Sequence, residues 1–144
     1  MADTTYLRQV VERTVRDALA KEFGARFEAR ALALTTGGTH EFDAVSEDGV
    51  VVASIKSASG KTAGGKNPSG KIKDSIAELY FLSLATAPIR VLVLTSPDFY
   101  AIMSGVLLGR LAPGLSLKLV PLPRHIQEQV EHVQKVASEE VSPP

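Results

Sequence analysis

Hydrophobic positions recur along the chain with two different periods, and the change of period separates helices from strands. From residue 4 to about Phe23, apolar residues recur every three or four positions, which predicts an amphipathic helix. The next apolar stretches, at 27–35, 40–45 and 50–57, alternate with polar residues or are rich in β-branched residues, which is typical of strands. The first part of the chain therefore predicts a helix followed by three strands.

The second part of the chain predicts alternating helices and strands. Helical spacing covers 71–85, 124–138 and a stretch that opens with the cap signal of Ser96 and Pro97 and ends near Leu111. The segment 89–95 is almost wholly apolar, as expected of a strand buried on both faces, and 115–120 predicts a short further strand. The predicted order is α-β-β-β-α-β followed by α-β-α, which defines an α/β fold.

Length and composition restrict the class of protein. The 144 residues suit a single domain, which we place at 1–140, with a frayed tail at 141–144. The chain has no cysteine, which excludes disulfides, zinc–thiolate sites and thiol nucleophiles. The sequence has neither an apolar run long enough to span a membrane nor an apolar leader, so we expect a cytoplasmic protein without membrane contact.

Charge changes this picture in one region. The 16 basic and 16 acidic residues cancel, which argues against a general polyanion binder. They are unevenly placed, however, because residues 56–73 carry several lysines and no acid. Within this region, 58–70 is rich in glycine, serine and lysine and has no hydrophobic anchor, which predicts a flexible loop. A neutral total can therefore hide one basic face.

The candidate chemistry lies in Thr39–Lys56, which reads as two strands joined by a turn at Asp48 and Gly49. Residues two apart in a strand share a face, so Glu41 and Asp43 lie together on the first strand. By the same rule Ser54 and Lys56 lie together on the second strand. Two carboxylates beside a lysine can hold a divalent metal and a phosphate, but an exposed sheet face with cross-strand ion pairs explains the same pattern.

The element order, together with an acid pair on one strand and a lysine on the next, resembles the PD-(D/E)xK nuclease superfamily. The resemblance covers residues 4–96 and implies a restriction-endonuclease-like core with a C-terminal α-β-α extension. It implies a Mg²⁺-dependent DNA phosphodiesterase, either an endonuclease or a Holliday-junction or repair-type nuclease. Asp43 matches the family's metal-binding aspartate, and Lys56 matches the lysine that positions or deprotonates the attacking water.

The sequence departs from this family at Ser54, where an Asp or Glu is usual. Serine has no charge to offer a hard cation, so three explanations remain open. Asp74 or Glu78 on the following helix supplies the acid, as in restriction enzymes that cut around CCGG and carry S-x-K. Alternatively, Glu41 completes the site, or the site is inactive and the fold serves nucleic-acid or protein binding.

Several other charged residues are candidates for the same site. The resemblance implies that Lys61, Lys66 and Lys71 contact the nucleic-acid backbone. Glu12 on the first helix is a further acidic candidate, although a surface pair with Arg8 or Arg16 explains it more simply. We expect DNA as the partner of a homodimer, and the apolar segment 101–109 offers either a self-association surface or ordinary core packing.

Two other classes of site find little support. Residues 65–71 fit the phosphate-loop pattern G-x-x-x-x-G-K, but Ile72 stands where that loop needs Ser or Thr for Mg²⁺. His40, His125 and His132 do not have the spacing of a metal site, and His40 should face away from Glu41 across its strand.

Overall fold

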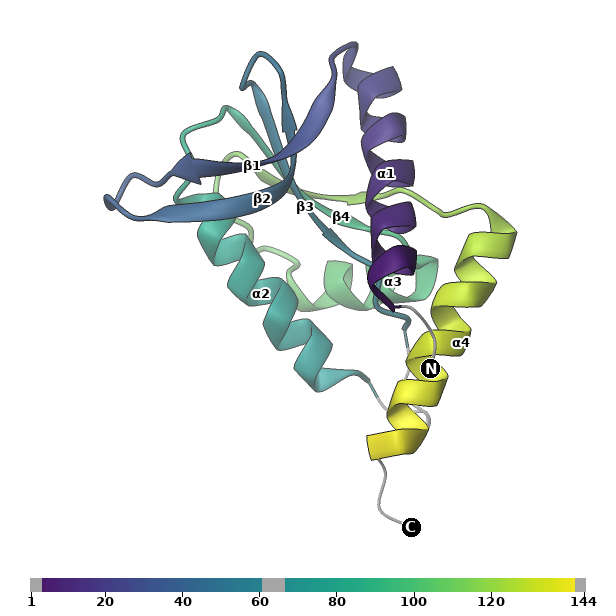
Figure 1. Cartoon of the computed structure of the whole chain (residues 1–144). Coiled ribbons are helices and arrows are strands. Elements are labelled where there is room, and N and C mark those ends of the chain that lie inside the picture. Colours follow the sequence, from purple (N-terminus) through teal and green to yellow (C-terminus); the bar gives the residue numbers. More distant parts are fainter. Residues whose placement is uncertain (1–3, 61–66, 142–144) are drawn as a thin grey trace.

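The structure is a computed structural model that describes residues 4–60 and 67–141, with side chains to residue 137 (Figure 1). The order of elements predicted from the hydrophobic pattern is confirmed over these residues. They form α1 (Thr4–Phe23), β1 (Phe27–Ala33), β2 (Thr39–Ser46), β3 (Val51–Lys56), α2 (Ser69–Ser83), β4 (Ile89–Leu94), α3 (Pro97–Val106), β5 (Leu115–Leu119) and α4 (Arg124–Val141).

The strands form one mixed sheet in the order β1-β2-β3-β4-β5. The first three strands are antiparallel neighbours, whereas β3, β4 and β5 run parallel. Parallel neighbours need a crossover, and α2 and α3 provide the two crossovers here. The described residues therefore build an α/β domain in which an antiparallel meander continues into a parallel sheet.

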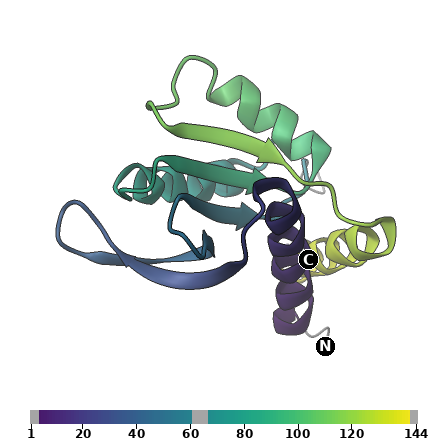
Figure 2. The ribbon, with the colours of Figure 1, turned by 90° about the horizontal axis from the view of Figure 1, so that it is seen from above.

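Helices cover both faces of the sheet. On one face, α2 and α3 pack on a core that includes Val52 and Leu92. On the other face, α1 and α4 pack on a core that includes Ala53 and Val91, and these two helices lie side by side (Figure 1, Figure 2). Consecutive residues of β3 and β4 thus enter opposite cores, which explains why apolar residues dominate both strands.

The meander contains a β-bulge at the position of the candidate aspartate. Between the pairs Glu28↔Val45 and Arg30↔Phe42, β1 contributes Ala29 alone, whereas β2 contributes both Asp43 and the residue after it. Two residues opposite one define a bulge, which bends the strand and turns a side chain in a new direction. The regular alternation that was expected along this strand is therefore interrupted at Asp43.

The segment that follows β3 is partly ordered by its neighbours. Ala58, Gly60 and Pro68 are buried, and α2 begins at Ser69, two residues earlier than expected, while 61–66 of the expected flexible loop 58–70 lie outside the described residues. Gly60 lies against Asp98 at the start of α3, where any β-carbon would collide. Gln134 of α4 holds the same segment, because its Oε1 accepts the backbone N–H of Ser59 at 3.1 Å and its Nε2 donates to the backbone carbonyl of Ser57 at 2.8 Å.

The apolar residues of α3 are explained mainly by core packing. Phe99, Met103 and Leu107 are buried, while Leu108, just after the helix, is 82% exposed. Across the described ranges, none of the helices is both long enough and apolar enough to cross a membrane. The cytoplasmic location stays a prediction.

Candidate functional site

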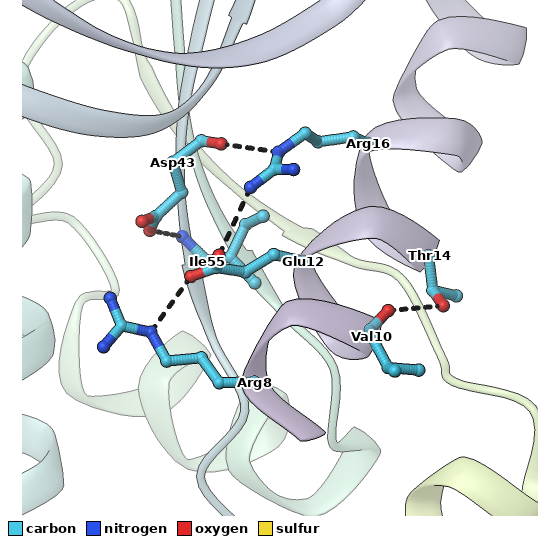
Figure 3. Close-up of polar contacts among 7 residues, drawn as sticks. All are labelled: Arg8, Val10, Glu12, Thr14, Arg16, Asp43 and Ile55. Carbon is cyan, nitrogen blue, oxygen red and sulfur yellow. Dashed lines mark hydrogen bonds and ion pairs between the residues drawn. The ribbon is translucent and has the colours of Figure 1, made fainter. Parts of the chain in front are cut away.

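Asp43 lies where β2 separates from β3. The recorded pairing of these strands is Ala44↔Ala53 and Val45↔Val52, so the ladder ends beside Asp43. Its carboxylate Oδ2 instead accepts the backbone N–H of Ile55 at 2.7 Å (Figure 3). The side chain thus replaces a lost strand–strand hydrogen bond and is fixed at the gap.

Arg16 of α1 stabilises the bulge through the backbone of Asp43. Its Nε donates to the backbone carbonyl of Asp43 at 2.9 Å (Figure 3). The same guanidinium pairs through a second nitrogen with Glu12, 3.2 Å away, and Arg8 pairs with Glu12 at 3.2 Å. Residues 8, 12 and 16 are one helical turn apart and share a face, so α1 presents a row of alternating charge to Asp43.

The pairs that the sequence suggested for Glu12 are therefore confirmed. These pairs are more buried than expected of a surface pair, because the Glu12 side chain is only 18% exposed. Its carboxylate is close enough to Asp43 for the two negative charges to interact.

Glu78 of α2 reaches the serine that departs from the nuclease pattern. The buried Ser54 donates its Oγ hydrogen to Glu78 Oε2 at 2.7 Å. His40 Nε2 lies 3.2 Å from Glu78 Oε1, which holds the carboxylate from a second side. Asp74, one turn earlier on α2, is exposed, and Glu41 is exposed with no recorded contact to this group in the described chain. Of the acids considered as replacements, Glu78 is the one that lies beside Ser54.

Sequence reasoning left His40 outside the site. Its ring stacks on Phe81 with centroids 4.1 Å apart and meets Phe42 edge-on. The expectation that His40 faces away from Glu41 is consistent with this position, because His40 and Phe42 both face α2. Glu78 and Phe81 are three residues apart on that helix, a spacing that could have indicated a shared partner. The other two histidines lie on the exposed surface of α4.

The charges of these elements converge on Asp43 and change its pKa. Burial is the largest cause of the raised pKa, and the carboxylates of Glu12 and Glu78 raise it further. The Ile55 N–H and the charge of Lys56 act in the opposite direction. Glu12 of α1 and Glu78 of α2 are therefore each close enough to repel the Asp43 carboxylate, and the charge of Lys56 offsets part of that repulsion.

Lys56 ends β3 at the edge of a cleft. The side chain is half-buried, and its Nζ has no hydrogen bond or ion pair to any described residue. The cleft has a volume of about 190 Å³ and is bounded by α1, the end of β3, α2 and α4. Its charged lining residues are Arg8, Glu12, Lys56, Lys71 and Asp74. Lys71 thus lines the same cleft as Lys56, and its contact with nucleic acid stays a prediction, whereas Lys61 and Lys66 lie outside the described residues.

The oxygen atoms of this site are of the kind that Mg²⁺ prefers as ligands. Within 4–60 and 67–141, no three His, Asp or Glu side chains gather closely enough to hold a metal ion together. Mg²⁺ nevertheless often binds one or two carboxylates and completes its shell with water and phosphate oxygens. Asp43 and Glu78 supply oxygens of that type, so the donor chemistry fits while no complete protein shell is assembled.

No family model, curated protein or solved structure matches the chain. The function is therefore inferred from the residues and their geometry. These place Asp43, on which the charges of Glu12 and Glu78 act, beside the carboxyl end of β3, where Lys56 has no hydrogen-bond or ion-pair partner among the described residues.

Proposed function

We propose that the chain is a PD-(D/E)xK-like, Mg²⁺-dependent DNA phosphodiesterase in which Glu78 takes the role of the missing strand acid. The observation that carries the proposal is the 2.7 Å hydrogen bond from Ser54 to Glu78. It brings a helix carboxylate beside the serine that replaces the family's acid, two residues before Lys56. This supports the first of the three explanations for Ser54.

The order and pairing of the first six elements support the proposal. A restriction-endonuclease-like core needs a helix against the meander, three antiparallel strands and a crossover helix leading to a parallel strand. Here α1, β1–β3, α2 and β4 have that order and pairing. The bulge and the early end of the β2–β3 ladder give Asp43 a fixed position in that core.

Each residue then has a distinct task. Asp43 and Glu78 would hold Mg²⁺, which stabilises charge on the phosphate and increases the acidity of water. The ammonium of Lys56, which has no partner among the described residues, would bind a phosphate oxygen and orient the attacking water. The Ile55 N–H and Arg16 hold Asp43 in place, so that its remaining oxygen stays available.

A catalytically degenerate domain is the second candidate. It is favoured by the fact that Glu12 and Glu78 already have protein partners, as does one oxygen of Asp43. Such a domain would keep the fold and serve nucleic-acid or protein binding. Both candidates predict DNA binding or another partner, but only the first predicts metal-dependent cleavage.

Cleavage of a mixed set of DNA substrates separates the two candidates. The set includes duplex, nicked and four-way-junction DNA, with Mg²⁺ or with EDTA. We expect Lys56→Ala, Asp43→Asn and Glu78→Gln each to lower the Mg²⁺-dependent rate by about 100-fold or more, as is typical when a group that stabilises developing charge is removed. Glu41→Gln is the matched control and should cleave like the wild type. Equal rates in all variants would exclude the catalytic assignment.

The homodimer belongs to the same proposal. Analytical ultracentrifugation of the purified chain, with and without DNA, would measure its mass in solution. A monomer under both conditions would contradict it.

A further inference from the structure

One hydroxyl at the wall of the cleft has no partner. Ser75 of α2 is 0% exposed, it lines the same cleft as Lys56, and its Oγ makes no hydrogen bond to any residue that the structure describes. A serine within a helix usually turns to solvent or bonds to a backbone carbonyl one turn earlier. Ser83 on the same helix does bond to a backbone carbonyl, that of Tyr80. Because an unsatisfied buried hydroxyl is destabilising, Ser75 requires an explanation.

The charges around this hydroxyl favour an anion. Lys56 has no partner among the described residues, and Lys71 lines the same cleft from the first turn of α2. The N-cap residue of that helix is Pro68. Its side chain has no polar atom, so no side-chain acceptor caps the backbone N–H groups of the first turn. The positive end of the helix dipole adds to the effect. The lining has two acids: Glu12 is already paired with two arginines, and Asp74 is exposed to solvent, which screens its charge.

We propose that Lys56, Lys71 and Ser75 form a binding subsite for a phosphate group, in which the Ser75 hydroxyl donates to a non-bridging oxygen. The subsite rests on the proposed function for the source of that group, a phosphodiester of DNA. The hydroxyl is buried in the free protein, so binding requires a side-chain movement at the cleft wall. The ligand then provides the hydrogen-bond acceptor that the fold leaves out.

Binding measured without metal tests the subsite independently of cleavage. The probes are inorganic phosphate, followed by NMR titration of the backbone amides, and a short DNA duplex in EDTA, followed by fluorescence anisotropy. Ser75→Ala and Lys71→Gln are the test variants. Ser83→Ala and Lys73→Gln, on the same helix but outside the cleft lining, are their matched controls.

Ser75→Ala should weaken binding about tenfold or more, because a hydrogen bond to a charged oxygen is lost. Its melting temperature should equal or exceed that of the wild type, because no internal hydrogen bond is removed. Lys71→Gln should also weaken binding, and both controls should bind normally. Unchanged binding in Ser75→Ala, or a clear fall in its melting temperature, would overturn the subsite.

The two proposals can fail separately. Phosphate or DNA binding that depends on Ser75, without cleavage under any metal condition, keeps the subsite and removes the nuclease function. Phosphate binding without DNA binding keeps the subsite and assigns it to a free phosphate compound. Metal-dependent cleavage with identical binding and rates in the wild type and Ser75→Ala removes the subsite and keeps the nuclease.

Discussion

The hydrogen bond between Ser54 and Glu78 predicts a measurable coupling in stability. The donor is fully buried, the two oxygens are 2.7 Å apart, and the acceptor is a carboxylate. Hydrogen bonds to charged groups contribute about 1.5–3 kcal/mol. The Glu78 side chain is 21% exposed and also meets His40, so water and the imidazole replace part of the lost contact. We therefore expect a value near the lower end, about 1.5 kcal/mol.

A double-mutant cycle isolates this value. Urea unfolding at pH 7 would compare the wild type, Ser54→Ala, Glu78→Gln and the double variant. In a separate thermal unfolding experiment, Ser54→Ala alone should lower the melting temperature by about 3–6 °C, given about 2–4 °C per kcal/mol for a chain near this size. The second change should then cost less in the presence of the first, and the difference is the coupling energy.

The matched control is a second cycle that combines Ser54→Ala with Glu41→Gln. Glu41 is an exposed acid on β2. That pair should show coupling close to zero. A coupling below about 0.5 kcal/mol for Ser54 and Glu78 would lie within the additivity of independent sites. It would show that the helix acid is not held by the serine, and the basis of the proposed function would fall with it.

Two further predictions concern Asp43 and Gln134. Asp43→Asn should raise the free energy of unfolding at neutral pH, because burial raises the pKa of this carboxyl above its ordinary 3.8 and its ionised form is therefore destabilising in the fold. The gain should shrink as the pH falls through the raised pKa of the folded state and disappear below 3.8, where the carboxyl is protonated in both the folded and the unfolded state. A gain independent of pH, or one that exposed Asp17→Asn shares, would contradict this prediction. Gln134→Ala should lower stability by about 2 kcal/mol, at about 1 kcal/mol for each of two lost hydrogen bonds to the segment after β3. Urea unfolding measures this against exposed Gln129→Ala on the same helix, and equal values would show that Gln134 does not hold the segment.

The acid cluster shows where sequence reasoning reached its limit. Asp74 and Glu78 are one helical turn apart and share a face, so spacing alone could not choose between them. The choice depends on how far α2 extends along the sheet, which the burial of Leu79 and Leu82 determines. That packing brings Glu78 to Ser54 and leaves Asp74 exposed at the cleft.

The position of Asp43 has a similar explanation. The alternating pattern predicted that Asp43 lies within a regular strand. The structure has a bulge there instead, which results from the register between β1 and β2. A register joins residues that are distant in sequence, and period-two patterning is silent about an extra residue. The contacts of His40 were missed for the same reason, because its partners Glu78 and Phe81 belong to a helix far along the chain. Glu78 is 38 residues after His40.

The sequence by itself determined the order of helices and strands, because local periodicity and turn residues decide which surfaces each segment must bury. It also placed Asp43 and Lys56 on neighbouring strands, since a short turn leaves little choice of partner. Only the tertiary structure decided that Glu78 meets Ser54, that Glu12 and Arg16 flank the bulge, and that Ser75 is buried without a partner. Those outcomes depend on how helices dock on a twisted sheet, which is set by the summed packing of both cores rather than by any single segment.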